Sequence, residues 1–378
     1  MESTWLSCSR DEALRLSPRS SRARSGVLSA YASGYDYARR KFPLDLVIAA
    51  ADRLFEEARA LLNPTGPSWF LLDGSSLTLN HSVSVAKAFP PATNQHGPSH
   101  WPVAKVVLAH DLSSGQSVRA EWGPMYGPGA VSEQRLAHKV IERLPSGSGV
   151  IADRGFGMFQ IVWALRDRPM LVRLTDRRAR GFTGTNLTQD LDVAHVWTPS
   201  ATERRGNPDL PADANVVGRV VVRRVLGPKG QAVTVCLFTN DQAMSVEELV
   251  ALYIQRWNIE TDLRSLKHTV GLEIIRAQTP EMVAHELILS VAAYNIVRTV
   301  MALSAQTAGV EPRRLSFARA RACIQIYAAR GPITPERIDQ LLRIIAARKL
   351  PPRNCKRSFP REVWKRSKAF PSRKVEAL

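Results

Sequence analysis

The sequence has few cysteines and no long apolar run. Its 378 residues include four cysteines, which stand far apart and form no Cys-x-x-Cys pair. Such spacing argues against a disulfide framework or a zinc cluster, and it favours a reducing compartment, the cytoplasm. No run of 18 or more apolar residues occurs, which argues against a membrane span. The first residues also lack the basic and apolar regions of a signal peptide.

Acidic residues are the minority among the charges. The chain has 34 Asp and Glu against 52 Lys and Arg, a formal net charge of +18. This excess predicts a polyanionic partner, because each phosphate that a basic side chain neutralises releases condensed counterions. We favour nucleic acid; a generally basic proteome or an association with the ribosome is the alternative. At 378 residues the chain is long enough for two or three domains with a proper core, and its 44% hydrophobic residues argue against disorder.

The most informative segment carries four polar residues at helical spacing. They are separated by two, three and six residues: Tyr253, Arg256, Glu260 and Lys267. A regular α-helix turns about 100° per residue, so these positions return to nearly the same direction and form one stripe. A helix that faces a core would place Leu and Ile there. A carboxylate between cations on one ridge instead predicts a site that coordinates a metal and holds DNA phosphates.

A second group of signals predicts alternating strands and helices before this segment. The expected elements are a strand at 69–79, a hairpin at 103–122, a helix at 135–144 capped by Ser132, a strand at 149–153, a helix near 157–166 and a strand at 170–174. This order places Asp73 in the first strand and Asp153 at the end of another. It matches a ribonuclease-H-like α/β core.

The rest of the chain divides into helical ends and a β-rich insertion. Residues 1–65 are expected to be a helical segment, which we interpret as a DNA-binding region, complete or truncated. The core is expected over 66–310, interrupted at 176–240 by a β-rich insertion with strands near 216–225 and 232–238. Residues 311–378 are expected to be helical, with a capped helix at 334–349 and a basic tail. From residue 346 onwards the tail holds eleven Lys and Arg.

Three carboxylates fit the chemistry of a metal-dependent phosphoryl transfer. Asp73, Asp153 and Glu260 combine two aspartates placed beside each other in a sheet with a glutamate on a helix packed across them. Hard oxygen ligands of this kind suit Mg²⁺ or Mn²⁺. Two such ions, about 3.5–4 Å apart, hold both the attacking and the leaving oxygen of an in-line displacement. The set therefore predicts a two-metal site.

Each of these residues also has an ordinary interpretation. Asp-Gly and Asp-Arg-Gly are common turn sequences. Arg256 and Glu260 could form a routine surface ion pair four residues apart, Lys267 could be solvated, and Trp257 could belong to the core. Trp197, the one tryptophan of the insertion, could stack on a flipped base, although a core position is the favoured interpretation. The order in which the acidic and basic residues occur together is what favours the catalytic interpretation.

In these motifs the chain resembles the DDE transposases of bacterial insertion sequences, and specifically the "insertion sequence four" family. The hallmark Tyr-x(2)-Arg-x(3)-Glu-x(6)-Lys is met without a gap by Tyr253, Arg256, Glu260 and Lys267. The surroundings of both aspartates and of Glu260 are similar too, as are residues 171–174 and 238–240. The resemblance covers roughly residues 37–305.

The resemblance implies a ribonuclease-H-like fold with a β insertion, and cut-and-paste transposition of DNA. The reaction would nick the element ends, with or without a hairpin, and join the freed 3′ hydroxyl to target DNA. The implied catalytic residues and ligands of two Mg²⁺ (or Mn²⁺) ions are Asp73, Asp153 and Glu260. The implied DNA contacts are Tyr253, Arg256, Lys267, Trp257 and Arg173.

The expected partners are double-stranded DNA, as terminal inverted repeats and target, and a second copy of the chain in a synaptic homodimer. No membrane partner is expected, and the expected location is the bacterial cytoplasm, with the nucleoid. A nuclease of the same fold without strand transfer is one alternative; the insertion and the basic tail favour the synaptic complex over it. A non-catalytic or decayed DNA-binding copy is the other.

Overall fold

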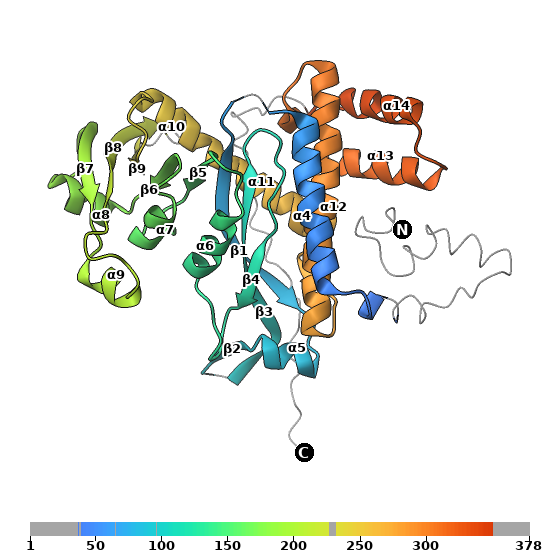
Figure 1. Cartoon of the computed structure of the whole chain (residues 1–378), viewed down its shortest axis with the longest axis horizontal. Helices are drawn as coiled ribbons and strands as arrows, with labels where there is room; N and C mark the ends of the chain where they lie inside the picture. Colours follow the sequence, from blue (N-terminus) through green and yellow to red (C-terminus); the bar gives the residue numbers. More distant parts are fainter. Residues whose placement is uncertain (1–36, 38, 65, 96, 227–231, 351–378) are drawn as a thin grey trace, which may run out of the picture.

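The computed structural model describes residues 37, 39–64, 66–95, 97–226 and 232–350. The predictions for residues 1–36 and for the basic tail beyond residue 350 lie outside the described residues. The described chain forms one central sheet with helices on both sides, as Figure 1 shows.

The sheet joins the predicted core strands in a mixed order. Its main path is β2-β3-β1-β5-β6-β9-β8-β7, and β4 pairs with β3 while β10 pairs with β1. β1, β5 and β6 are parallel to one another, and β3 and β9 are antiparallel to their neighbours in that group. The bounds are β1 Trp69–Leu79, β2 Pro91–Asn94, β3 Gly97–Asp111, β4 Glu121–Pro124, β5 Gly149–Ala152, β6 Met170–Arg173, β7 Leu191–Trp197, β8 Val216–Leu226, β9 Ala232–Thr239 and β10 Ile274–Ile275.

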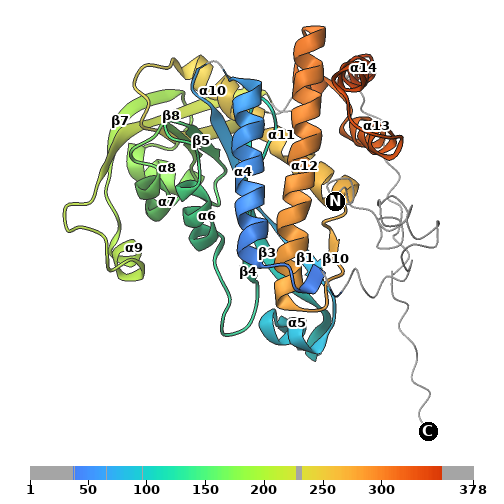
Figure 2. The same cartoon turned by 45° about the vertical axis from the view of Figure 1, so that its right-hand side comes forward.

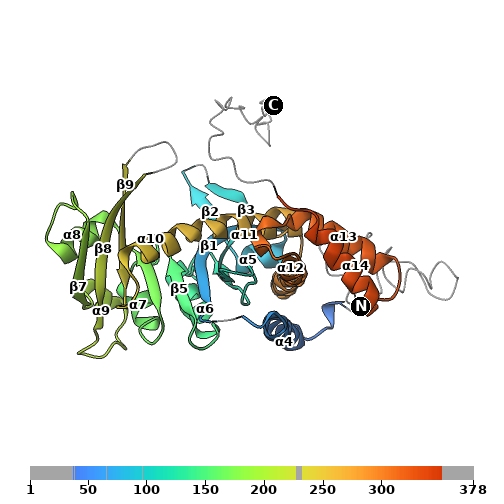
Figure 3. The same cartoon turned by 90° about the horizontal axis from the view of Figure 1, so that it is seen from above.

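Helices cover both faces of the sheet because the central strands are apolar on both faces. Alternate residues of β1 enter different cores: Phe70 and Leu72 pack with α6 and α7, whereas Leu71 packs with α10 and α11. Seen from above in Figure 3, α10 and α11 lie over one face, and α6 and α7 lie over the other. The bounds are α5 Val83–Ala88, α6 Glu133–Glu142, α7 Phe159–Ala164, α10 Val246–Ile254 and α11 Asn258–Arg264.

The segment at 176–240 forms the predicted strands and also adds helices. β9 pairs with β6, so β7, β8 and β9 extend the central sheet rather than form a sheet of their own. Two helices lie in the same segment, α8 Asp176–Thr183 and α9 Ala201–Gly206. Trp197 is 1% exposed and contacts the rings of Phe182 and Phe238. The core interpretation of Trp197 is therefore confirmed.

Two long helices pack on the side of the molecule away from β7, β8 and β9 (Figure 1). α4 Leu44–Leu62 and α12 Pro280–Ala308 run side by side in both Figure 1 and Figure 2. Hydrogen bonds join them near both ends: the His285 ring contacts the Phe42 carbonyl at 3.0 Å, and Gln306 donates to the Leu62 carbonyl at 3.2 Å. Beyond α12 lie η4 Pro312–Arg314, α13 Phe317–Ala329 and α14 Pro335–Ala346. Thr334 caps α14 as the sequence predicts.

Among the described residues, α12 is the one helix long and apolar enough to cross a membrane. However, 72% of its most apolar window is buried inside the protein. Polar side chains such as Asn295 and Arg298 are also buried along it and form hydrogen bonds. These features are those of a packed core helix.

Residues 246–270, which we call the helical run, do not form the regular α-helix that the sequence predicts. After α10 comes a 3₁₀ turn, η2 Gln255–Trp257, then α11, then a π turn, η3 Ser265–Val270. A 3₁₀ turn overwinds a helix and a π turn underwinds it, so the two deviations partly cancel. The run ends at Gly271, whose φ of 99° favours glycine.

Candidate active site

Two predicted ligands, Asp73 and Asp153, lie side by side on neighbouring strands. Leu72 of β1 pairs in register with Ala152 of β5, which is followed by Asp153. Parallel strands are about 4.8 Å apart, and residues at one level point to the same face. The next strand continues the row, because Ala152 pairs with Val172, just before Arg173. The sheet thus presents two carboxylates and a guanidinium in a row beneath the helical run.

The Asp73 carboxyl lies in an environment that favours its neutral form. Burial raises the pKa of Asp73 to about 6, and the carboxylates of Asp153 and Glu133 raise it too. A hydrogen bond from the Gly74 amide, at 2.8 Å, and the Arg256 guanidinium act in the opposite direction. Two carboxylates held together in this way would gain from a cation between them.

The helical run touches β1 at two levels. Arg256 Nη1 lies 3.9 Å from Asp73 Oδ2, and the Arg256 side chain is 11% exposed. Lys267 Nζ donates to Ser75 Oγ at 3.2 Å and to the Ser76 carbonyl at 3.0 Å. The interpretations of Arg256 as a surface ion-pair partner and of Lys267 as simply solvated are therefore wrong.

Glu260 lies between these two contacts along the run. Its side chain is exposed, and it makes no hydrogen bond or ion pair with any residue that the structure describes. The structure thus brings Asp73 and Asp153 together without bringing Glu260 against them. Across the described residues, no three His, Cys, Asp or Glu side chains are grouped as metal ligands.

Three more predicted DNA contacts cluster around Arg256. Tyr253 is 5% exposed, and burial raises the pKa of its hydroxyl, which the neighbouring Arg256 and Arg173 lower in part. Neither guanidinium, of Arg256 or of Arg173, forms a hydrogen bond to the Tyr253 hydroxyl. The Tyr253 hydroxyl and Arg256 Nε are both buried without a hydrogen-bond partner among the described residues. Trp257 is 57% exposed, with the Arg256 guanidinium 5.5 Å from its ring centroid. The core interpretation of Trp257 is wrong, because this ring faces solvent.

The sequence did not reveal Glu133 as a neighbour of the site. Glu133 begins α6 after the Ser132 cap, and a Cβ on Gly74 would lie 2.9 Å from its carboxyl carbon. The next residue, Gln134, donates to the Gly155 carbonyl at 3.1 Å. The start of α6 therefore contacts the segments that follow both aspartates. The one available sequence signal was the absence of a side chain at Gly74, which allows this approach.

The donors present suit a hard divalent cation. Asp73 and Asp153 offer carboxylate oxygens, which such ions prefer, and their mutual repulsion is the electrostatic cost that a cation would remove. Arg256 relieves part of that repulsion, although a guanidinium cannot coordinate a metal. Glu260, exposed on the overlying helix and lacking a competing partner, is available as a further oxygen donor.

Comparison with known proteins identifies the family of the chain. A family model described as a transposase DDE domain matches residues 64–296, which contain all the site residues named above. A curated relative, the transposase InsG for insertion sequence element IS4 of Escherichia coli, is 28% identical over 355 residues, which cover 86% of this chain and 77% of that protein. The chain therefore belongs to the DDE transposases of the "insertion sequence four" type.

Proposed function

We propose that this chain catalyses cut-and-paste transposition of the DNA element that carries its gene. One observation carries the proposal. Asp73 and Asp153 lie side by side beneath a helical run that touches β1 through Arg256 and Lys267 on either side of Glu260. Members of this family are transposases, and a phosphoryl transfer on DNA needs carboxylates, phosphate-binding cations and an open face together.

The metal-binding residues in this proposal are Asp73, Asp153 and Glu260. Two bound Mg²⁺ or Mn²⁺ ions would supply a Lewis acid and an activated oxygen nucleophile. Asp73 contributes as its charged form, and Arg256, 3.9 Å away, favours that form. Glu260 would approach the two aspartates from the helical run, and Lys267 keeps this part of the run close to β1.

Basic and aromatic side chains around the carboxylates would hold the DNA. Arg256, Lys267 and Arg173 can bind phosphate oxygens, and a guanidinium can do so through two parallel hydrogen bonds. The buried Tyr253 hydroxyl and Arg256 Nε lack hydrogen-bond partners within the described protein, and a side-chain shift that exposed them would let them bond to the terminal nucleotides. The exposed Trp257 ring is free to stack on a base.

The proposal extends to the fold and the assembly. β1, the β3–β4 hairpin, α6, β5, α7 and β6 follow one another in the order expected of a ribonuclease-H-like core. Core boundaries at 66–310 with an insertion at 176–240, a helical N-terminal DNA-binding region over 1–65 and a basic tail within 311–378 are parts of the same proposal. The proposed partners are terminal-repeat DNA, target DNA and a second copy at synapsis, in the bacterial nucleoid.

A cleavage and joining assay tests the function. The full chain is incubated with Mn²⁺ or Mg²⁺ and a labelled duplex that carries the terminal repeat flanking its own gene, with plasmid as target. We expect a nick at the repeat end and a joined product. Glu260→Gln should abolish both without weakening DNA binding.

The matched control is Glu142→Gln, at the last residue of α6, whose side chain is 64% exposed. This variant should cleave as the wild type does. Cut ends that are never joined would identify a nuclease without strand transfer. Binding without any cleavage would identify a regulatory or decayed copy, and equal activity of Glu260→Gln would refute the assignment of the site.

A further inference from the structure

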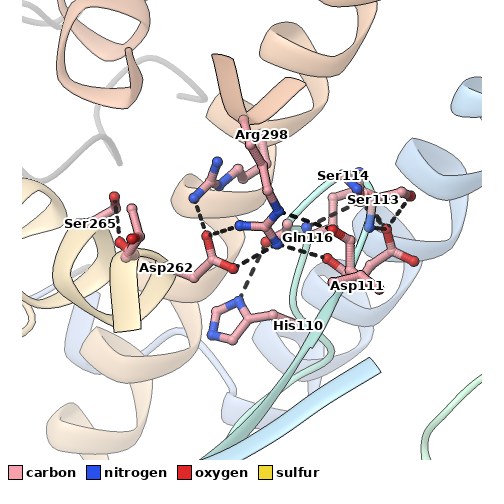
Figure 4. Close-up of polar contacts among 12 residues, drawn as sticks. His110, Asp111, Ser113, Ser114, Gln116, Asp262, Ser265 and Arg298 are labelled. Carbon is pink, nitrogen blue, oxygen red and sulfur yellow. Dashed lines mark hydrogen bonds and ion pairs between the residues drawn. The ribbon is translucent and has the colours of Figure 1, made fainter. Parts of the chain in front are cut away.

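A second carboxylate of α11, Asp262, is enclosed by two arginines in the core. Asp262 is fully buried, and its Oδ1 accepts hydrogen bonds from Arg298 Nη2 and, at 2.8 Å, from Arg313 Nη1. Arg313 Nη2 also donates to Asp262 Oδ2 at 2.9 Å, so its guanidinium binds the carboxylate as a fork. Asp262, Arg298 and Arg313 together are called the Asp262 clamp (Figure 4 shows Asp262 and Arg298).

The clamp connects α11 to the end of β3. Arg313 donates to the carbonyls of Leu112, at 3.0 Å, and Asp111, at 3.3 Å. Arg298 donates to the Tyr294 hydroxyl at 2.8 Å, which donates to the Gly115 carbonyl at 2.8 Å. β3 is the antiparallel partner of β1, the strand that carries Asp73. The clamp therefore fixes the position of α11 relative to β3, the strand that pairs with the Asp73 strand.

Asp262 and Glu260 point to opposite sides of α11. They are two residues apart, and two residues turn a helix by about 200°. This agrees with their environments, because Asp262 is 0% exposed and Glu260 is exposed. A rotation of α11 that moved Asp262 out of the clamp would turn Glu260 away by the same angle.

α11 is not a regular continuation of the helices beside it. α11 has seven residues and lies between the 3₁₀ turn η2 and the π turn η3. Such turns interrupt the regular hydrogen-bond ladder and often mark functional hinges. Two buried side chains of α11 therefore constrain its rotation: Ile259 through apolar packing and Asp262 through directional bonds.

Stability alone does not account for an ionic anchor. Removing ions from water costs so much that apolar residues of similar volume often stabilise a core equally well. What a forked carboxylate–guanidinium pair adds is a fixed direction. Leu or Met in place of these residues would bury α11 without fixing its angle.

We propose that Asp262 is a positioning residue for Glu260: the Asp262 clamp fixes the rotation of α11 and so directs the Glu260 carboxylate toward the metal ions at Asp73 and Asp153. This inference rests on the proposed function, since it takes Glu260 as a metal ligand. Residues that hold a metal ligand in its orientation commonly change metal affinity by ten- to a hundredfold when they are replaced.

Binding of Mn²⁺ alone to the full chain tests the proposal without relying on activity. Free Mn²⁺ is counted by electron paramagnetic resonance, and the thermal unfolding of each variant is measured in parallel. Arg313→Lys keeps the charge and loses the fork, so we expect its Mn²⁺ affinity to fall about tenfold or more. Its Mn²⁺ midpoint for strand nicking should rise by a similar factor.

The matched control is Asn295→Ala. Asn295 bonds to the Ser117 amide and carbonyl, both at 2.8 Å, and so holds α12 to the segment after β3, and these side-chain hydrogen bonds do not involve α11. This variant should lose thermal stability yet keep wild-type Mn²⁺ affinity within about twofold. Affinity that falls equally in both variants in proportion to unfolding temperature, or no fall in Arg313→Lys, would overturn the proposal.

Two further variants separate this proposal from the proposed function. Asp73→Ala and Glu260→Gln should each weaken Mn²⁺ binding in the wild-type background. If neither does, the metal site itself is wrong, whatever Arg313→Lys shows. If both do while Arg313→Lys binds as the wild type, the metal site stands and only the role of Asp262 is refuted.

Discussion

Two carboxylates on the same seven-residue helix have opposite environments. Glu260 is exposed and has no partner among the described residues, whereas Asp262 is completely buried between Arg298 and Arg313. One is free to acquire a ligand, and the other has its bonding capacity filled by the protein. The same contrast divides the site as a whole: the face with Asp73 is incompletely neutralised, while the buried cluster behind α11 is closely bonded. The chemistry itself should therefore depend on the Asp73 face, whereas the Asp262 clamp should contribute mainly to stability and affect the reaction only through the position of Glu260.

The strongest test of this division is Glu260→Gln. Loss of a metal ligand removes several kcal/mol of transition-state stabilisation, so nicking should fall by about a thousandfold or more. The unfolding free energy should change by less than about 0.5 kcal/mol, as is usual for an exposed residue with no contacts. Urea unfolding beside the nicking assay measures both, and a large loss of stability would contradict the division.

Asp262→Asn should have the opposite pattern: it should lower the unfolding free energy more than Glu260→Gln does. Breaking a buried ion pair by removing one partner costs about 3–5 kcal/mol, and here two guanidinium groups lose their counter-ion. Urea unfolding followed by circular dichroism gives the change in free energy. A variant as stable as the wild type would mean that the Asp262 clamp is neutral in energy.

The pH dependence of stability should have opposite signs in the two regions. Burial lowers the pKa of His110, beside the clamp, to about 4 from 6.5. A histidine with a depressed pKa stabilises the fold above pH 6.5, and this contribution is lost as the pH falls toward 4. The raised pKa of Asp73, about 6 against 3.8, acts the other way: its contribution to stability is present at low pH and lost as the pH rises through 6.

The two contributions should largely cancel in the wild type between pH 4 and 6.5. His110→Gln should make stability rise as the pH falls, and Asp73→Asn should make it fall, each by up to about 3 kcal/mol over this range. Urea midpoints at four pH values measure the slopes. Parallel curves for the two variants would show that one of these environments is wrongly described.

The sequence predicted the open region, the face with Asp73 and Asp153, much better than the buried Asp262 clamp. The core strands and the Ser132-capped helix follow from local patterns, and the row of Asp73, Asp153 and Arg173 follows once β1, β5 and β6 pair in register. The clamp does not, because Arg298 and Arg313 are 36 and 51 residues from Asp262 along the chain. Each resembles an ordinary surface charge until the fold brings them together.

Two other differences have the same origin. Local patterns indicated the strands at 216–225 and 232–238, but the pairing of β9 with β6 is a long-range choice that no local pattern fixes. The spacing of the Tyr/Arg/Glu/Lys motif assumed a uniform helix, whereas η2 and η3 change the winding. Tertiary contacts at Asp73 and Ser75 still bring Arg256 and Lys267 to β1, whereas exposed Glu260 makes no such contact among the described residues.

The smallest expected effect is that of Trp257→Ala, and it tests whether the open region binds DNA as well as metal. The ring is 57% exposed, so its removal should change the unfolding free energy by less than about 0.5 kcal/mol. If Trp257 stacks on a base, affinity for terminal-repeat DNA should fall about tenfold, the effect of about 1–3 kcal/mol per stacked base. Trp257→Phe should restore most of the loss, because it keeps an aromatic face. Fluorescence anisotropy at fixed salt measures each affinity, and equal binding by Trp257→Ala would mean that this exposed ring does not contribute to the DNA-binding surface.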